Sequence, residues 1–382
     1  MTMELGNEAV NEYAALLAGK RVGLVTNFSG LTATFKPTYQ VLNELSAGVT
    51  KLFTPEHGLH GIAGAGESVE SYFDNALNLE VVSLYGSHRA PAGDDFTDID
   101  VLAFDIQDIG VRYYTYIYTL LESMQAAAQA NMPVLVFDRP LPLGRQQPVG
   151  QAMTHDYFSF VGLLPLPNRY ELTIGELAAW IKDHLTPQLQ LTVAIMRGWD
   201  ASRNLLDNGL PWVAPSPNLA TLDALRLYPG LCLLEGTNVS EGRGTVKPFE
   251  QFGAPWIDAN QLANCLTETA AQDDHLRFQP VWFEPLASKH THEICQGVQV
   301  HIMDNAFNPL TLGYNVLKAM MTLWPDRFTM DLVSPVIGTK HRFIEYLAGR
   351  QLQTIADLDA GIELSGVTDH KFWQESRAYY RY

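Results

Sequence analysis

The chain has 382 residues, of which 47% are hydrophobic, so it can bury the cores of two domains, or of one large domain with additions. Its formal net charge of −17 argues against nucleic acid and anionic membrane surfaces as partners, because both bind through cationic patches. Its three cysteines are odd in number and have no CxxC spacing, which argues against a disulfide framework and a structural zinc site.

The N-terminal segment shows no targeting signal. It lacks a basic stretch followed by an apolar stretch, and no apolar run further along the chain reaches the length of a membrane span. The sequence therefore predicts a cytoplasmic protein, unless an export signal has been removed from it.

Strands and helices alternate over the first part of the chain. A short helix is expected over Asn7–Leu17 and a crossover helix over Pro37–Leu45. Apolar runs predict the strands Arg21–Asn27, Val49–Thr54, Glu80–Leu84, Val101–Asp105, Pro133–Phe137 and Leu189–Met196. Up to about residue 140 this alternation indicates an α/β fold, with a mostly parallel sheet covered by helices on both faces.

The later part of the chain is less regular. Thr173 and Glu176 form a capping-box pattern at the start of a helix, and Gly230–Leu234 is expected to be a further strand. From about Phe249 the pattern predicts a smaller α+β domain. Its expected elements are the helices Asp258–Ala270, Leu312–Leu323 and Thr339–Ala348 and the strand Gly297–Ile302. We therefore expect two domains, residues 1–245 and residues 246–382.

The stretch Val101–Tyr118 carries the most information about function. An apolar strand is followed by a polar turn, and from Val111 apolar and aromatic residues recur at helical spacing. In open α/β sheets, ligands bind beyond the carboxyl ends of the strands. The polar group at this turn therefore predicts a binding site; its members are Asp105, Gln107, Asp108, Arg112 and Tyr113. The alternative is an N-cap aspartate followed by a tyrosine-rich core helix.

Other predicted strands also end in polar groups. The residues at these exits are Glu56 and His57, Asp138 and Arg139, and Glu235. Several such exits on one sheet edge describe a cleft lined by carboxylates, arginines and tyrosines. Such a cleft suits a sugar, because carboxylates perform acid/base chemistry or bind hydroxyls, while aromatic rings stack on the pyranose.

Competing chemistries fit the sequence less well. The glycine-rich loop over residues 61–66 is GIAGAG rather than GxGxxG and follows no clear strand, so a dinucleotide fingerprint is weakly supported. The sequence has no GxxxxGK[ST], GxSxG or HExxH motif. The histidines that could bind a metal with Glu56 have spacings that match no familiar site; they are His57, His60, His290 and His292.

Six segments of the chain resemble the NamZ-type exo-β-N-acetylmuramidases, a family long catalogued only as a domain of unknown function. In order, the segments are LFTPEHGLHG, FDIQDIGVRYYTY, VFDRPLPLGR, PLPNRYELTIGELA, PSPNL and LLEGTNVSEGRGT. The resemblance implies a glycoside hydrolase that removes terminal N-acetylmuramic acid from the non-reducing end of peptidoglycan fragments. It also implies a Rossmann-like, doubly wound catalytic domain, an auxiliary C-terminal domain and a cleft between the two.

The resemblance further implies roles for individual residues. Glu56, in the PEHG motif, is the leading catalytic carboxylate, with Glu235 or Glu241 as the second and Asp108 as a weaker candidate. The expected substrate-binding residues are His57, Asp105, Gln107, Asp108, Arg112, Tyr113, Asp138, Arg139, Arg169, Asn218 and Arg243. Arg112 is expected to grip the lactyl carboxylate of N-acetylmuramic acid, because arginine binds carboxylates in a two-pronged arrangement. We expect no metal or cofactor, and a small glycan fragment as the partner.

Two other classes of function fit the same residues. A non-catalytic protein could bind a sugar or a nucleotide on such a sheet, and a metal-dependent deacetylase or amidase could act on the same cell-wall sugars. Because no export signal is visible, internal recycling of muropeptide fragments is the expected setting for the hydrolase.

Overall fold

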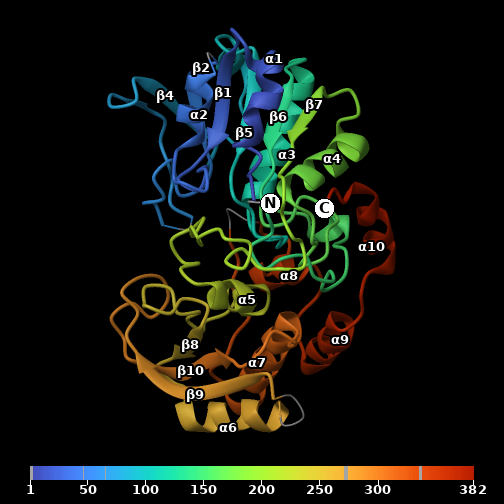
Figure 1. Cartoon of the computed structure of the whole chain (residues 1–382). Helices are drawn as coiled ribbons and strands as arrows, with labels where there is room; N and C mark the ends of the chain where they lie inside the picture. The colour runs from blue at the N-terminus through green and yellow to red at the C-terminus, as the bar shows by residue number, and fades with distance from the viewer. Residues whose placement is uncertain (1–2, 46, 65, 271–273, 335–337) are drawn as a thin grey trace.

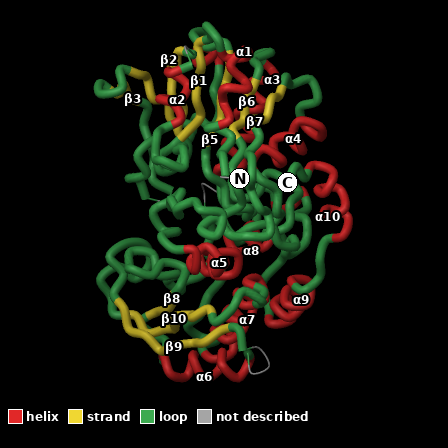
Figure 2. The backbone as a smooth tube through the Cα atoms, in the orientation of Figure 1, coloured by secondary structure: helices red, strands yellow, loops and turns green. Residues whose placement is uncertain are grey.

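The computed structural model describes residues 3–45, 47–64, 66–270, 274–334 and 338–382. Figure 1 shows a large sheet flanked by helices at one end of the molecule and a smaller sheet with its own helices at the other. Between the two lies a middle zone that is rich in loops (Figure 2). No helix within these described ranges is long and apolar enough to cross a membrane.

The large sheet has seven strands in the order β3-β4-β2-β1-β5-β6-β7. β3 is antiparallel to β4, and all other neighbouring pairs are parallel. Counted along the chain, the parallel strands follow the order 3-2-1-4-5-6 of the Rossmann fold, which confirms the predicted fold class. The strands are β1 (Arg21–Thr26), β2 (Gly48–Thr54), β3 (Tyr72–Asp74), β4 (Leu79–Ser83), β5 (Val101–Asp105), β6 (Val134–Phe137) and β7 (Leu191–Ala194).

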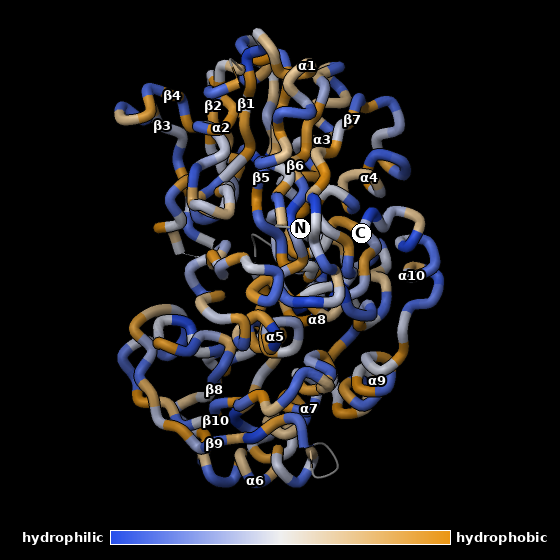
Figure 3. Tube along the Cα trace, viewed as in Figure 1, coloured by the Kyte–Doolittle hydropathy of each residue, from blue (hydrophilic) through white to orange (hydrophobic). Residues whose placement is uncertain are grey.

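Helices cover both faces of this sheet. They are α1 (Ala14–Leu17), α2 (Thr38–Glu44), α3 (Tyr116–Gln129) and α4 (Ile174–Leu185). Successive side chains of a strand point to opposite faces. On β5, Leu102 and Phe104 therefore join the hydrophobic cluster of α3 and α4, whereas Val101 and Ala103 join the cluster of α1 and α2. Burial on both sides explains why these strands are continuous apolar runs, coloured orange along the centre of the sheet in Figure 3.

The second part of the molecule surrounds a small antiparallel sheet with the order β8-β10-β9. Its strands are β8 (Gln251–Ala254), β9 (Leu276–Phe283) and β10 (Cys295–Ile302), and its helices are α6 (Ala259–Thr269), α7 (Pro309–Leu323), α8 (Phe343–Ala348), α9 (Ile355–Ser365) and α10 (His370–Ser376). The predictions of α6, α7 and β10 are confirmed to within three residues. α8 begins at Phe343 rather than at Thr339.

Short 3₁₀ helices complete the described structure. They are η1 (Ala9–Tyr13), η2 (Gly93–Phe96), η3 (His155–Tyr157), η4 (Cys232–Gly236) and η5 (Arg377–Tyr379). The helix predicted over Asn7–Leu17 is therefore η1 followed by α1. The predicted capping box of α4 is confirmed, since Thr173 Oγ1 accepts from the Glu176 amide at 3.2 Å and Glu176 accepts from the Thr173 amide at 3.0 Å.

Two secondary-structure predictions are wrong, one in the type of the element and one in where a helix begins. Gly230–Leu234 is not a strand but the junction of α5 (Leu222–Leu231) with η4. A short apolar run that is buried on every side has no periodicity to separate strand from helix, and the helix begins at the cap Thr221. The helix after β5 begins at Tyr116 rather than at Val111, because Val111 pairs instead with Arg169 in an isolated bridge.

The C-terminal tail returns to the large sheet. Met3 and Tyr382 pack against the same small hydrophobic cluster, and the Tyr382 hydroxyl donates to Asp138 Oδ2 at 2.7 Å. Since Asp138 follows β6, the tail ties the second part of the molecule to the carboxyl edge of the sheet.

α5 crosses α7 where two glycines meet. A Cβ atom added at Gly230 would lie 1.8 Å from the Pro309 carbonyl oxygen, and one at Gly313 would lie 2.5 Å from the Gly230 carbonyl oxygen. These are backbone atoms, which cannot swing aside. The close crossing therefore fixes how α5 and η4 lie on α7.

We predict that Gly230→Ala lowers the free energy of unfolding by about 1–3 kcal/mol, because the added methyl group forces the two helices apart. Urea unfolding measures this loss. Gly48→Ala is the matched control, since a Cβ there meets nothing within 4 Å, and we expect it to stay within about 0.5 kcal/mol of the parent. Equal stability of the two variants would contradict the tight crossing.

Candidate active site

A cavity of about 250 Å³ lies where the carboxyl edge of the large sheet faces the second part of the molecule. From the first part it is lined by Glu56, His57, Gly66, Tyr85, Tyr113, Tyr114, Thr115, Tyr116, Phe160 and Val161. The rest of the lining is Ser216, Asn218, Leu219, Tyr228, Glu235, Arg243, Phe249, Ser334 and Phe343. A few polar groups among aromatic walls are typical of sites for small organic ligands.

Glu56 is held in this cavity from two sides. It follows β2, whose buried residues fix the strand exit. Its Oε1 accepts from the Gly66 amide at 2.9 Å, and its Oε2 accepts from Thr115 Oγ1 at 2.8 Å. His57 takes the left-handed conformation, with φ of 72°, and its Nδ1 lies 2.8 Å from the Ala63 carbonyl oxygen. The glycine-rich loop thus folds back to hold the glutamate.

Tyrosine hydroxyl groups surround Glu56. Burial, the charge of Glu56 and a hydrogen bond to Glu56 all raise the pKa of Tyr85. Burial and the charge of Glu56 likewise raise the pKa of Tyr116, whose hydroxyl donates to the Pro215 carbonyl at 2.8 Å. Both hydroxyls therefore stay protonated near neutral pH and can act as hydrogen-bond donors.

Glu235 belongs to a chain of alternating charges. Arg243 donates to Glu235 through Nε at 3.1 Å and also through Nη2, and Arg243 Nε lies 3.2 Å from Glu241 Oε1. Glu241 Oε2 in turn lies 2.9 Å from Lys289 Nζ. Burial lowers the pKa of Arg243, but the charges of Glu235 and Glu241 outweigh burial and hold that pKa above its usual value. Arg243 thus stays cationic and fixes Glu235 in the cavity wall.

This arrangement can perform acid/base chemistry on a sugar. Glu56 and Glu235 enter the cavity from different parts of the molecule, and the rings of Tyr228 and Phe249 lie 4.9 Å apart at the Glu235 side. Most glycosidases use a pair of carboxylates that flank the scissile bond.

The cavity brings together six of the residues predicted from the sequence. They are Glu56, His57, Tyr113, Asn218, Glu235 and Arg243. The Tyr113 hydroxyl donates to the Pro229 carbonyl, so its ring rather than its hydroxyl is offered to a ligand. Glu241 lies outside the lining, with a relative exposure of 2%.

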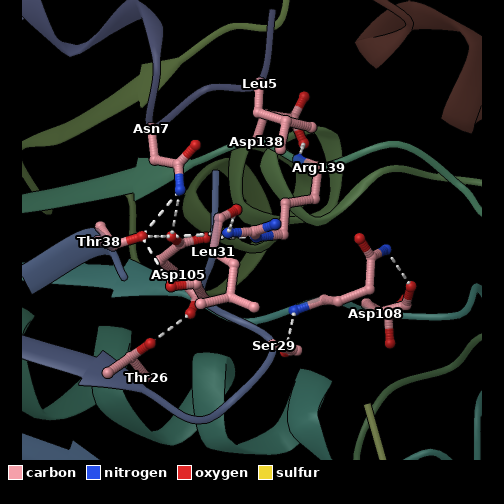
Figure 4. Close-up of polar contacts among 12 residues, drawn as sticks. Leu5, Asn7, Thr26, Ser29, Leu31, Thr38, Asp105, Asp108, Asp138 and Arg139 are labelled. Carbon is pink, nitrogen blue, oxygen red and sulfur yellow. Dashed lines mark hydrogen bonds and ion pairs between the residues drawn. The ribbon is translucent and has the colours of Figure 1, made fainter. Parts of the chain in front are cut away.

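Asp105 is fully buried in a polar cluster outside the cavity (Figure 4). It pairs with Arg139, accepts from Thr38 Oγ1, and accepts from Asn7 Nδ2 at 3.2 Å. Gln107 donates to the Asp108 and Pro140 carbonyls at 2.7 and 2.8 Å. These side chains are occupied by contacts within the protein. Gln107 and Arg139 border a separate cavity of about 40 Å³.

Asp108 and Asp138 are also buried among internal donors. Asp108 Oδ2 accepts from the Gly110 amide at 2.8 Å and from the Tyr170 hydroxyl, while Oδ1 is buried without a hydrogen bond. Asp138 accepts from Thr173 Oγ1 at 2.9 Å and from the Gly175 amide at 2.8 Å, at the start of α4. Burial raises the pKa of each carboxyl group to about 6, with the charge of Glu176 contributing at Asp138.

Arg112 lies outside the cavity and away from any helix N-terminus. Its relative exposure is 0%, and it donates to the Leu166 carbonyl at 3.0 Å and to the Leu347 carbonyl at 2.6 Å. The helical spacing that begins at Val111 predicted a helix that includes Arg112, but α3 begins four residues after Arg112. Arg169 pairs with Glu171 at 2.6 Å and also lies outside the cavity lining.

Comparison with known proteins identifies the family. Models of the N-terminal and C-terminal regions of the exo-β-N-acetylmuramidase NamZ match residues 22–223 and 226–382. The chain belongs to the NamZ family. The two NamZ models meet between residues 223 and 226, within α5. The domain boundary expected after residue 245 stays a prediction.

Relatives of the chain include both a curated enzyme and solved structures. The peptidoglycan β-N-acetylmuramidase NamZ of Bacillus subtilis is 40% identical over 319 residues, which is 83% of this chain and 77% of the relative. A crystal structure of a DUF1343 family protein from Bacteroides fragilis is 31% identical, with a TM-score of 0.84 over 100% of this chain and 99% of its own. A second such protein from B. fragilis, at 24% identity, has a TM-score of 0.74 over the same shares and is similar in fold.

Several cavity residues of this NamZ-family chain were not predicted. Thr115 holds Glu56 and lies in the tyrosine-rich motif, so its position beside Tyr113 was a usable signal. Phe160 and Phe343 come from loop 158–166 and the start of α8. No pattern in the sequence places these two rings opposite a strand exit.

Asp108 provides a prediction about pH. Asp108 has a higher pKa in the folded protein than in the unfolded chain, so the folded protein binds this proton more tightly. The stability that this proton contributes is lost as the pH rises from 3.8, the ordinary pKa, to about 6, the pKa in the folded protein. Asp108→Asn cannot ionise, and we therefore predict that its unfolding free energy falls less than the parent's over this range. Urea unfolding at several pH values between about 4 and 7 measures the difference.

Asp100→Asn is the control for this experiment. The hydrogen bond from Arg21 lowers the pKa of Asp100 to about 2, so its contribution is present above pH 3.8 and is lost as pH falls toward 2. The Asp100→Asn substitution should therefore change the pH dependence of stability below pH 3.8, and not between pH 4 and 6. An Asp108→Asn protein with the parent's slope between pH 4 and 6 would show that Asp108 does not titrate as described.

Proposed function

We propose that the chain is an exo-acting β-N-acetylmuramidase that removes terminal N-acetylmuramic acid from the non-reducing end of peptidoglycan fragments. Membership of the NamZ family supports the glycosidase class. The observation that carries the proposal is that Glu56 and Glu235 line one aromatic-walled cavity and approach it from different parts of the chain.

Glu56 is the proposed general acid/base. Its two hydrogen bonds fix the carboxyl group while leaving it half-buried at the cavity wall. In this role it protonates the glycosidic oxygen as the bond to the leaving sugar breaks. Tyr85 and Tyr116 place neutral hydroxyl groups beside it.

Glu235 is the proposed second carboxylate. In a retaining enzyme this group attacks the anomeric carbon, and in an inverting enzyme it removes a proton from the attacking water. The Arg243 guanidinium holds it in place for either task. Glu241 is nearly inaccessible and contacts Arg243 and Lys289, so we assign it to positioning this pair.

The residues of the buried polar clusters are proposed to position the site rather than to touch the sugar. They are Asp105, Gln107, Asp108, Asp138, Arg139, Arg112 and Arg169. His57, Tyr113 and Asn218 line the cavity and are proposed to bind the substrate.

We further propose intracellular recycling of peptidoglycan fragments as the setting. The three cysteines are free thiols, and two of them, Cys232 and Cys295, are buried. Free thiols are typical of proteins in a reducing compartment.

A chromogenic N-acetylmuramide separates this proposal from its rivals. Release of the chromophore without added metal supports the hydrolase. Binding without turnover supports a sugar-binding protein, and acetate release supports a deacetylase. Within the described parts of the chain, no group of three or more His, Cys, Asp or Glu side chains is placed to hold a metal ion.

We predict that Glu56→Gln lowers kcat by about 10²–10⁴-fold, because the amide keeps the shape of the side chain and removes its titratable proton. Steady-state kinetics on the chromogenic muramide measures the loss. Glu44→Gln, on the exposed face of α2, is the control and should keep the parent rate. A Glu56→Gln enzyme that retains most of its kcat and its thermal stability rules out the acid/base role.

A further inference from the structure

A substrate carboxylate that enters this cavity needs a cation beside it. N-acetylmuramic acid carries a lactyl carboxylate, yet the cavity already presents Glu56 and Glu235. A carboxylate entering such a site is excluded unless a cation compensates for its lost hydration. Among the described lining residues, Arg243 is the only lysine or arginine, and it is already bound by Glu235 and Glu241.

Arg112 cannot supply this charge. It is completely buried, and its terminal nitrogens donate to the carbonyl groups of Leu166 and Leu347. Reaching the cavity would require breaking both hydrogen bonds and exposing a guanidinium that packs under the end of α8. A different cation must therefore be sought beside the cavity.

Arg89 lies at the edge of the cavity, on the loop that follows β4. Its guanidinium carbon is 4.4 Å from the centre of the Phe160 ring, and Phe160 lines the cavity. The ring of Tyr85, another lining residue, lies 5.7 Å from that of Phe160. The charge of Arg89 also acts on Tyr85 and lowers its pKa against the opposing effects of burial and Glu56. Arg89 is therefore close enough to influence the groups that surround Glu56.

Among the described residues, the Arg89 guanidinium donates one hydrogen bond, so its other N–H groups are free to bind a ligand. Its Nε donates to the Gly86 carbonyl at 3.3 Å, and it forms no ion pair with a carboxylate among the described residues. Its charge acts on Glu122, whose pKa is raised by burial and lowered by Arg89. A half-buried arginine that stacks on an aromatic ring and has no ion-pair partner is ready to bind an anion.

We propose that Arg89 and Tyr85 form a carboxylate subsite at the edge of the cavity, and that this subsite binds the lactyl group of the terminal muramic acid. This inference rests on the proposed function. Phe160 holds the guanidinium plane by a cation–π contact, which leaves its Nη atoms to donate two parallel hydrogen bonds to the carboxylate. The Tyr85 ring packs beside Phe160 and forms part of the wall of this subsite, while its hydroxyl stays hydrogen-bonded to Glu56. The subsite thus selects muramic acid over glucosamine.

The first test uses the parent protein with three chromogenic β-glycosides: N-acetylmuramide, its lactyl methyl ester and N-acetylglucosaminide. Esterification removes the negative charge and keeps nearly the same shape. We expect kcat/KM to be about 10–150-fold higher for the free acid than for the ester, the range for a hydrogen bond to a charged group. Equal cleavage of acid and ester would overturn the proposal, whereas no cleavage of any substrate would overturn the proposed function instead.

The second test uses Arg89→Met and Arg89→Lys. The methionine variant should lose about 10–150-fold in kcat/KM on the free acid and stay within about twofold of the parent on the ester and the glucosaminide. Arg89→Lys should recover part of the loss, because lysine keeps the charge but not the two-pronged geometry. Arg277→Met, on exposed β9, is the matched control and should leave all three rates unchanged. If Arg89→Met lowers all three rates equally, Arg89 does not bind the lactyl group.

Discussion

A buried ion pair at the centre of the large sheet decides where this molecule can bind a ligand. In a sheet of Rossmann order, the crevice between β1 and β5 is the usual ligand site. Here Asp105 ends β5, and its carboxylate is satisfied by Arg139, Thr38 and Asn7. Leaving such a buried charge unpaired costs about 3–5 kcal/mol. The N-terminal segment is therefore held across the crevice, and a ligand must bind elsewhere along the sheet edge.

The remaining site is the exit of β2, and a second part of the chain completes it. β2 supplies Glu56, which is half-buried because the glycine-rich loop and Thr115 hold it without covering it. Glu235 comes from η4, which the close crossing of α5 and α7 fixes in place. The alternating charges of Glu235, Arg243, Glu241 and Lys289 then join η4 to the loop between β9 and β10. Neither part alone presents both carboxylates, so the proposed site needs both parts of the chain.

The sequence was sufficient to predict the sheet and the carboxylate at the exit of β2, since buried strands are continuous apolar runs and their exits are marked by polar residues. It could not distinguish an exit that opens into a cavity from one covered by distant segments. Asp105 is covered by Asn7, and Asp138 by Tyr382, at separations of 98 and 244 residues. Gly230–Leu234 was misassigned for a related reason, because a run buried on all sides has no periodicity. The aromatic walls formed by Phe160 and Phe343 depend on how loops meet, which no local pattern encodes.

The central claim is that one muramic acid residue binds between Glu56 and Glu235, in the cavity shared by the two parts of the chain. A crystal structure of the Glu56→Gln protein with a bound muramyl disaccharide tests this claim most directly, because the variant keeps the shape of the site and slows turnover. We predict that the terminal sugar lies against Tyr228 and Phe249, with its glycosidic oxygen beside residue 56. Sugar bound instead in the small cavity beside Gln107 and Arg139, with the larger cavity empty, would contradict the account.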